Sequence, residues 1–150
     1  MWNFLWHLRG ATPVPARISD AQVLERVEKL LADQRKPVIP SRPTELRFES
    51  PLWDSPLGPN WLAMVIYDRG SFRIEHGAHG RRLRYDLRSL HGFVFCLGAA
   101  IIFFAAGVMN ARLPGGVRYA AFAFTWLYGM NMVLAWARVP RAIRKAVSAE

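Results

Sequence analysis

The sequence predicts an α+β membrane protein, in which an N-terminal amphipathic helix and a small antiparallel β-sheet of about four strands precede a two-helix transmembrane hairpin. Two stretches without an ionised side chain, residues 92–111 and 119–137, contain 20 and 19 residues. A helix of that length crosses a hydrocarbon layer about 30 Å thick. Only the sequence RLPGGVR separates them, which predicts a tight antiparallel return. Upstream, apolar and polar residues alternate as they do in half-buried strands.

The first 17 residues are expected to form an interfacial N-terminal segment. Trp2, Leu5 and Trp6 recur at helical spacing. Tryptophan is favoured at membrane interfaces, so a short helix here would lie among the lipid headgroups. Packing on the protein's own domain or on a partner is the alternative.

Residues 18–35 are expected to form the amphipathic helix. Ser19 and Gln22 match the capping-box pattern at its start. Val23, Val27 and Leu31 then follow helical spacing and form one apolar stripe. The protein's own sheet is the first candidate to cover this stripe, and a partner protein is the second.

A proline-spaced linker over residues 36–43 is predicted to lead into a cytoplasmic β-domain over residues 44–88. Alternation around residues 46–48, 72–74 and 83–87 indicates three strands, and the apolar run 61–67 indicates a central one. The last strand runs almost directly into the first apolar stretch, with Ser89 as a candidate N-cap. The sheet is therefore expected to sit against the membrane surface.

The transmembrane hairpin is assigned to residues 89–138, with helices over about 90–111 and 118–138. Residues 139–150 are expected to form a basic C-terminal tail, with a short surface helix after Pro140. Four basic residues flank each outer end of the hairpin, against two in the connecting loop. The positive-inside rule therefore predicts a multi-pass protein of the plasma (inner) membrane with both termini in the cytoplasm.

Small residues recur every fourth position in both apolar stretches, which lets helix backbones approach closely. Packing of the two spans on each other is the simpler reading, and docking on a larger membrane protein is the other. The predicted helix-packing or partner residues are Gly92, Cys96, Ala100, Ala121, Thr125 and Gly129.

The chain carries a formal net charge of +9, and much of the excess borders the apolar stretches. We therefore expect the bases to meet a membrane surface rather than nucleic acid, because anionic headgroups attract juxtamembrane arginines. The predicted headgroup contacts are Arg81, Arg82, Arg84, Arg88, Arg138, Arg141 and Arg144.

Few residues suggest reaction chemistry. The run Glu75-His-Gly-Ala-His79 holds three potential metal ligands, but two glycines and a position after a strand favour a turn over a helical metal motif. His91, at the edge of the first stretch, is expected to be a solvated interfacial histidine rather than a cofactor ligand. Cys96, the single cysteine, is expected to pack as a small apolar residue. We predict no catalytic residue, cofactor or metal.

These features favour a non-catalytic accessory, anchoring or assembly subunit that docks on a larger membrane protein complex. The expected partners are the lipid bilayer and that larger integral membrane protein. Two alternatives are a self-assembling pore or effector and a small membrane-bound enzyme that uses the Glu75–His79 loop. A pore requires a polar stripe through the spans, and Thr125, Asn110 and Asn131 are too few to form one.

Overall fold

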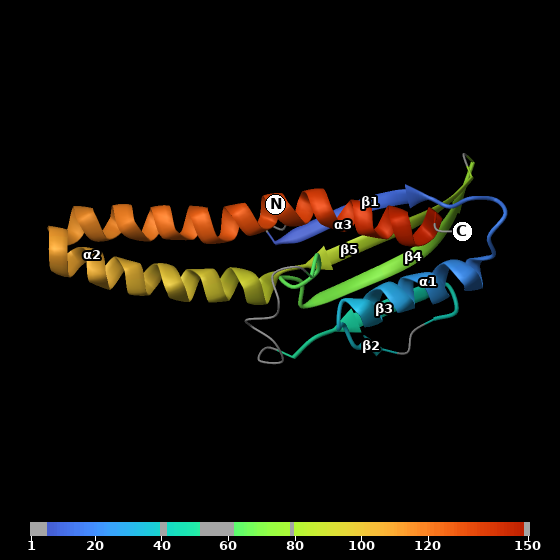
Figure 1. The fold of residues 1–150 in the computed structure, drawn as a ribbon, viewed down its shortest axis with the longest axis horizontal. Coiled ribbons are helices and arrows are strands. Elements are labelled where there is room, and N and C mark those ends of the chain that lie inside the picture. The colour runs from blue at the N-terminus through green and yellow to red at the C-terminus, as the bar shows by residue number, and fades with distance from the viewer. Residues whose placement is uncertain (1–5, 40–41, 52–61, 79, 149–150) are drawn as a thin grey trace.

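The computed structural model describes residues 6–39, 42–51, 62–78 and 80–148. It has an α+β fold, in which a five-stranded antiparallel sheet carries two helices on one face and a long apolar helix projects from one end (Figure 1). The predicted α+β class and the antiparallel sheet are thus confirmed. In chain order the elements are β1 His7–Pro13, α1 Asp20–Asp33, β2 Val38–Ile39, β3 Glu45–Glu49, β4 Arg69–Gly77, β5 Gly80–Arg88, α2 Leu90–Phe124, the π-helical turn η2 Thr125–Gly129 and α3 Met130–Ser148.

The sheet has the strand order β1-β5-β4-β3-β2, with every pair antiparallel. Its centre is the β4–β5 hairpin, which closes where Gly77 pairs with Gly80. Gly80 has a φ of +100°, a conformation that glycine adopts without strain. A turn was predicted in the glycine-rich loop after residue 75, and the hairpin places it at the end of the sheet away from α2.

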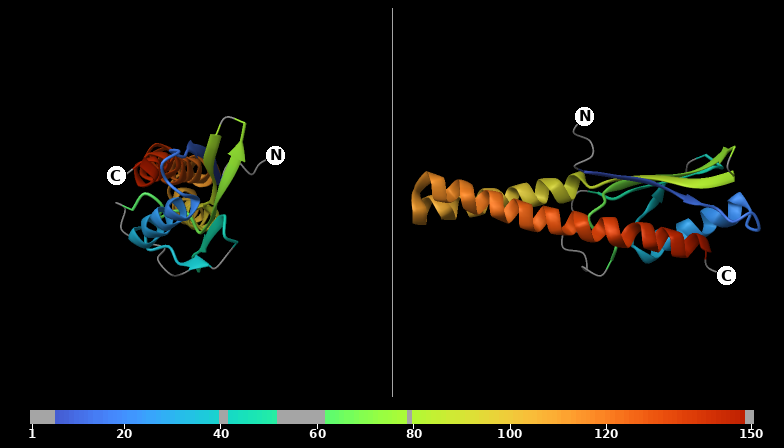
Figure 2. Two further views of the ribbon diagram at one scale, coloured as in Figure 1. Left: turned by 90° about the vertical axis from the view of Figure 1, so that its right-hand side faces the viewer. Right: turned by 90° about the horizontal axis from the view of Figure 1, so that it is seen from above.

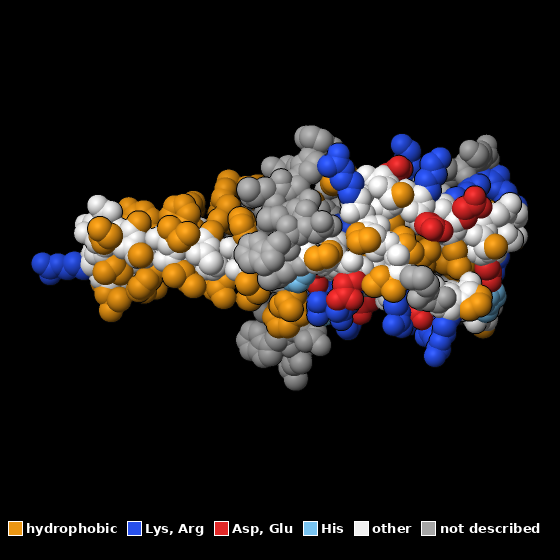
Figure 3. All heavy atoms as spheres, turned by 90° about the horizontal axis from the view of Figure 1, so that it is seen from below, with side chains coloured by type: hydrophobic (Ala, Val, Ile, Leu, Met, Phe, Trp, Pro, Cys, Tyr) orange, Lys and Arg blue, Asp and Glu red, His pale blue; other side chains and the backbone are white. Residues whose placement is uncertain are grey.

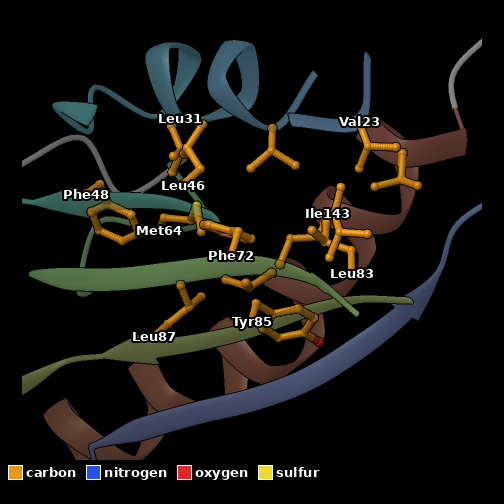
Figure 4. Close-up of a cluster of buried hydrophobic side chains, with 14 of the residues drawn as sticks. Val23, Leu31, Leu46, Phe48, Met64, Phe72, Leu83, Tyr85, Leu87 and Ile143 are labelled. Carbon is orange, nitrogen blue, oxygen red and sulfur yellow. The ribbon is translucent and has the colours of Figure 1, made fainter. Parts of the chain in front are cut away.

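One face of the sheet forms the protein core, to which α1 and the end of α3 also contribute (Figure 4). Strand residues of period two supply the sheet side of this core: Leu46, Phe48, Phe72, Ile74, Leu83, Tyr85 and Leu87. Gly70 lies beneath this layer. A methyl group there would come within 2.3 Å of Phe48 Cε1 and 2.5 Å of Leu87 Cδ2, so the core rings pack directly on the strand backbone.

The amphipathic helix α1 begins as predicted. The Ser19 side chain accepts a hydrogen bond from the Gln22 amide, and the Gln22 side chain accepts one from the Ser19 amide. The stripe residues Val23, Val27 and Leu31 are fully buried in the sheet core. The protein's own sheet therefore covers this helix, which was the first of the two candidates.

The apolar helix α2 leaves helical geometry at Ala111 and Arg112, where the φ values are −138° and +59°. Figures 1 and 2 show the chain turning back at this point. We call residues 90–110 the first arm and residues 113–137 the second arm. They meet closely near the turn, because a methyl group on Gly107 would lie 2.8 Å from the Cα of Gly116.

The end of α3 corrects the prediction of a surface tail. The helix continues through Pro140, and Val139, Ile143 and Val147 are fully buried in the sheet core. Pro140 lacks an amide donor and costs one helical hydrogen bond. Burying three branched side chains contributes about 1.5–3 kcal/mol each, which outweighs that loss. Basic residues alternate with these apolar ones, so the composition resembled that of a surface helix.

The N-terminal helix predicted from the tryptophan spacing is absent from the described residues. Residues 7–13 form β1, an edge strand paired with β5, and Trp2 and Leu5 lie outside the described part of the chain. The sheet therefore has five strands rather than about four. Pairing with β5 gives residues 7–13 backbone hydrogen bonds along one edge of the strand, whereas a short isolated helix is marginal in water.

The prediction of a central strand at residues 61–67 is also wrong. The described part, residues 62–67, forms turns that place Met64 and Tyr67 in the core. Residues buried in a turn produce the same continuous apolar run as a central strand. Burial raises the pKa of Tyr67, and its hydroxyl has no hydrogen-bond partner among the described residues.

Candidate functional site

The arms carry the most unusual surface of the molecule. Among the described residues, every exposed large hydrophobic side chain except Ile39 lies between Val94 and Trp136. Ile102 is 71% exposed and Met109 is 87% exposed. Figure 3 shows this apolar half beside a sheet half that is rich in charge. By length and composition the helical stretch Leu90–Ser148 is one candidate membrane span, and 17% of its most apolar window is buried inside the protein.

The predicted small-residue faces lie in different surroundings. Cys96 and Ala100 are buried on the inner side of the first arm, and a methyl group on Gly92 would lie 3.3 Å from the Ile66 carbonyl oxygen. Ala121 and Thr125 are exposed, and Gly129 is half-buried. Their role in partner contact stays a prediction.

The inner face of the second arm instead contains Ala123, Tyr128 and Met132. The interval of five residues between Ala123 and Tyr128 spans the π-helical turn η2. A π turn inserts one residue into the helical repeat and rotates the following residues around the axis. This rotation lets one helix bury a stripe against the first arm and then bury Val139 and Ile143 against the sheet.

A polar cluster lies where the sheet meets the arms. Asp68 is 3% exposed, and one of its carboxylate oxygens accepts hydrogen bonds from Arg88 Nε at 3.1 Å and Nη2 at 2.7 Å. Its other oxygen accepts the His91 amide at 3.2 Å, in the first turn of α2. Asp68 therefore caps the helix that Ser89 was predicted to cap, because an acceptor at this position satisfies a free N-terminal amide.

Ser89 has a different role from the predicted cap. It is fully buried, and its hydroxyl lies 3.1 Å from the Tyr128 hydroxyl of η2. Its amide donates to the Trp6 carbonyl at 2.7 Å, and the Trp6 ring packs on Phe93 at 5.6 Å. Ser89 therefore joins the two arms to each other and to the strands β1 and β5. No local pattern indicated this, because Tyr128 and Trp6 are 39 and 83 positions from Ser89.

The second face of the sheet carries no described helix and is covered with ionic side chains. The strand register arranges them in four rows. The first row, nearest the arms, contains His7, Arg88, Arg69 and Glu49, and the second contains Arg9, Asp86, Ser71 and Arg47. The third row contains Ala11, Arg84, Arg73 and Glu45, and the fourth contains Pro13, Arg82 and Glu75. We call this surface the open face.

Ion pairs cross the open face between neighbouring strands. Asp86 accepts from His7 at 2.6 Å and from Arg9 at 2.8 Å, and Arg69 pairs with Glu49. Within β3, Arg47 donates to Glu45 at 2.8 Å, and this hydrogen bond lowers the pKa of the Glu45 carboxyl. Arginines outnumber carboxylates in the rows, so the face is basic overall.

The predicted headgroup arginines separate into three groups. Arg88 lies beside the arms, whereas Arg82 and Arg84 lie in the rows farther along the open face. Arg81 is on the opposite side of β5, where it pairs with Asp20 at 2.6 Å and donates to the Pro15 carbonyl at 2.9 Å. It thereby secures the start of α1. A third group follows α3 with exposed side chains: Arg138, Arg141 and Arg144.

The Glu75–His79 loop does not gather its ligands in the described chain. Glu75 pairs with Arg84 at 3.2 Å, and His76 Nε2 lies 3.2 Å from Asp20 on α1. His79 lies outside the described residues. Among the residues that the structure describes, no group of three or more His, Cys, Asp or Glu side chains is arranged to hold a metal ion.

Comparisons with protein-family models, curated proteins and solved structures give no match.

Proposed function

We propose that this chain is a non-catalytic accessory subunit that is anchored in a membrane by its two arms, as a transmembrane hairpin. The first arm contains residues 90–110, and 21 residues of α-helix extend about 31 Å. This length matches the thickness of a hydrocarbon core. Aqueous solvent would face apolar side chains around both arms, and a bilayer would cover them.

In this arrangement the turn at Ala111 and Arg112 crosses to the far side of the membrane. The start of β1 and the end of α3 both lie with the sheet, on the near side. The flanking arginines favour the cytoplasm of a bacterial inner membrane for that side. Labelling of Arg112→Cys by a membrane-impermeant reagent in intact cells tests this orientation, and exclusive labelling of Arg82→Cys would reverse it.

The observation that carries the accessory role is the continuity of α3. The helix leaves the second arm and buries Val139, Ile143 and Val147 in the sheet core without an intervening linker. The buried contacts of Ser89 and Asp68 fix the other arm to the same sheet. The open face is therefore held at a set height and direction relative to the anchor, which suits a subunit that presents a surface to a larger complex.

Purification of the full chain in a mild detergent, followed by mass spectrometry, tests this function. A stoichiometric membrane-protein partner is expected, and recovery of a homogeneous lone monomer would overturn the proposal. Ala121→Leu fills the exposed small face and is expected to release the partner. Ala105→Leu is the matched control, because Ala105 is exposed on the other arm and outside the predicted faces. Equal retention by both variants would remove this face from the interface.

A further inference from the structure

The open face contains two hollows, and the one nearer the arms has a volume of about 870 Å³. We call it the proximal groove, and the other, of about 680 Å³, the distal groove. Four residues line both grooves: Glu45, Ser71, Arg73 and Asp86. Five arginines line the proximal groove: Arg42, Arg47, Arg69, Arg73 and Arg88.

The charge of the proximal groove suits an anion. Its five arginines face three lining carboxylates, Glu45, Glu49 and Asp86, and Arg88 also pairs with the buried Asp68, which leaves an excess of one positive charge. Each carboxylate already pairs with a basic side chain. Arg47 contacts Glu45 through Nε, and Arg69 contacts Glu49 through Nη2. A guanidinium group carries five N–H donors, so Arg47 and Arg69 each keep donors that no described residue accepts, and these can bind an oxyanion.

The position of the groove identifies the source of that anion. Arg69 and Arg88 stand in the row nearest the arms, and Arg88 is separated from α2 only by Ser89. The headgroup layer extends about 5–8 Å beyond the hydrocarbon on each side. Strand rows on one face are about 6.6 Å apart, so this layer reaches the first row and the edge of the second. Arg82, in the fourth row, lies about 20 Å farther out than Arg88 and is beyond it.

We propose that the proximal groove binds the phosphate of an anionic phospholipid in the adjacent leaflet. Guanidinium groups match phosphate geometry with paired N–H donors, and the bonds are strengthened by charge. The lipid would hold the base of the sheet at the membrane surface and fix the rotation of the anchor. This inference rests on the proposed membrane insertion.

The test compares two double variants of the full chain in detergent micelles. Arg47→Gln with Arg69→Gln removes two arginines of the proximal groove that do not line the distal groove. Arg82→Gln with Arg84→Gln removes two arginines of the distal groove that do not line the proximal one. Native mass spectrometry measures binding of added phosphatidylglycerol and phosphatidylcholine.

The wild-type chain is expected to retain phosphatidylglycerol in preference to phosphatidylcholine. The proximal variant is expected to bind phosphatidylglycerol about 30-fold more weakly, from about 1 kcal/mol for each arginine near the headgroups. The distal variant is expected to bind as the wild type does. Equal losses in both variants, or equal binding of the two lipids by the wild type, would overturn the proposal.

Further measurements separate the remaining explanations. Displacement of the lipid by millimolar glycerol 3-phosphate would assign the groove to a soluble phosphate and overturn the lipid assignment. If the proximal variant fails to fold, Arg47→Lys with Arg69→Lys keeps the charge and is expected to bind several-fold more weakly than the wild type.

Alkaline extraction of cell membranes tests insertion independently. Release of the chain there refutes the proposed anchor, whereas the micelle titration still reports on the groove.

Discussion

The burial of the C-terminal helix leads to a sharp prediction for Ile143. Ile143 is fully buried between α1 and the sheet, although its neighbours in sequence include Arg141 and Arg144 (Figure 4). Replacing it with alanine removes three carbon atoms from a closely packed site. Such substitutions lose the transfer free energy of the removed atoms and leave a cavity that the surroundings fill only in part.

The expected loss for Ile143→Ala is about 3–4 kcal/mol, within the range for isoleucine-to-alanine changes in cores. For a chain of 150 residues, 1 kcal/mol corresponds to about 2–4 °C in Tm, so the variant should melt about 10 °C lower. Ile143→Val removes one carbon and should lose about 1 kcal/mol. The fraction of chain that survives a brief protease pulse after heating in detergent measures unfolding of the sheet, whatever the arms retain.

Lys145→Ala is the control, because Lys145 is exposed on the same helix. Surface substitutions of this kind usually change stability by about 0.5 kcal/mol or less. If Ile143→Ala and Lys145→Ala melt within about 1 °C of each other, the C-terminal segment is a surface tail. The sheet would then not be rigidly attached to the second arm.

Four further predictions concern the core and the arms. Tyr67→Phe should stabilise the fold by about 1 kcal/mol, because the buried hydroxyl has no partner among the described residues, and a loss of that size would reveal one. Burial raises the pKa of Tyr67, so above about pH 10 the hydroxyl loses its proton in the unfolded chain but keeps it in the folded one. The wild type should therefore lose stability with rising pH more steeply than Tyr67→Phe does. Gly70→Ala should lower stability by about 1–3 kcal/mol, because the added methyl group would clash with Phe48 and Leu87. Gly77→Ala should change stability little, because its added methyl group meets only one atom, at 3.8 Å. Similar melting temperatures for the two variants would refute the close packing at Gly70. Gly107→Ala should separate the arms and lower the melting temperature in detergent. Gly98→Ala should do neither, because its added methyl group meets nothing within 4 Å. Equal effects of the two variants would refute the contact between Gly107 and Gly116.

Local patterns predicted several elements well. The capping box at Ser19, the stripe from Val23 to Leu31 and the alternation in β3, β4 and β5 all depend on residues close in sequence. Such patterns reflect hydrogen bonds within one turn or burial of one face, and the sequence displays both directly. The strand β1 was missed because its pairing with β5 joins residues about 75 positions apart.

The candidate site was predicted less completely. Charge counts identified a basic surface, but they could not separate Arg88 beside the arms from Arg81, which secures α1 on the opposite side of its strand. The register of the sheet makes that separation. Likewise, the capping of α2 by Asp68 depends on a residue more than 20 positions before the helix amide that it binds.

By itself the sequence determined that two apolar segments exist, that a small α+β unit precedes them and that their flanks are basic. These properties follow from composition and from the short-range periodicity of helices and strands. Only the tertiary structure decided that the second segment continues into the sheet core and that the open face presents its arginines in rows. Both depend on which distant surfaces bury each other: Val139, Ile143 and Val147 form an apolar stripe whose partner lies on the strands, and the strand register alone aligns Arg69 with Arg88.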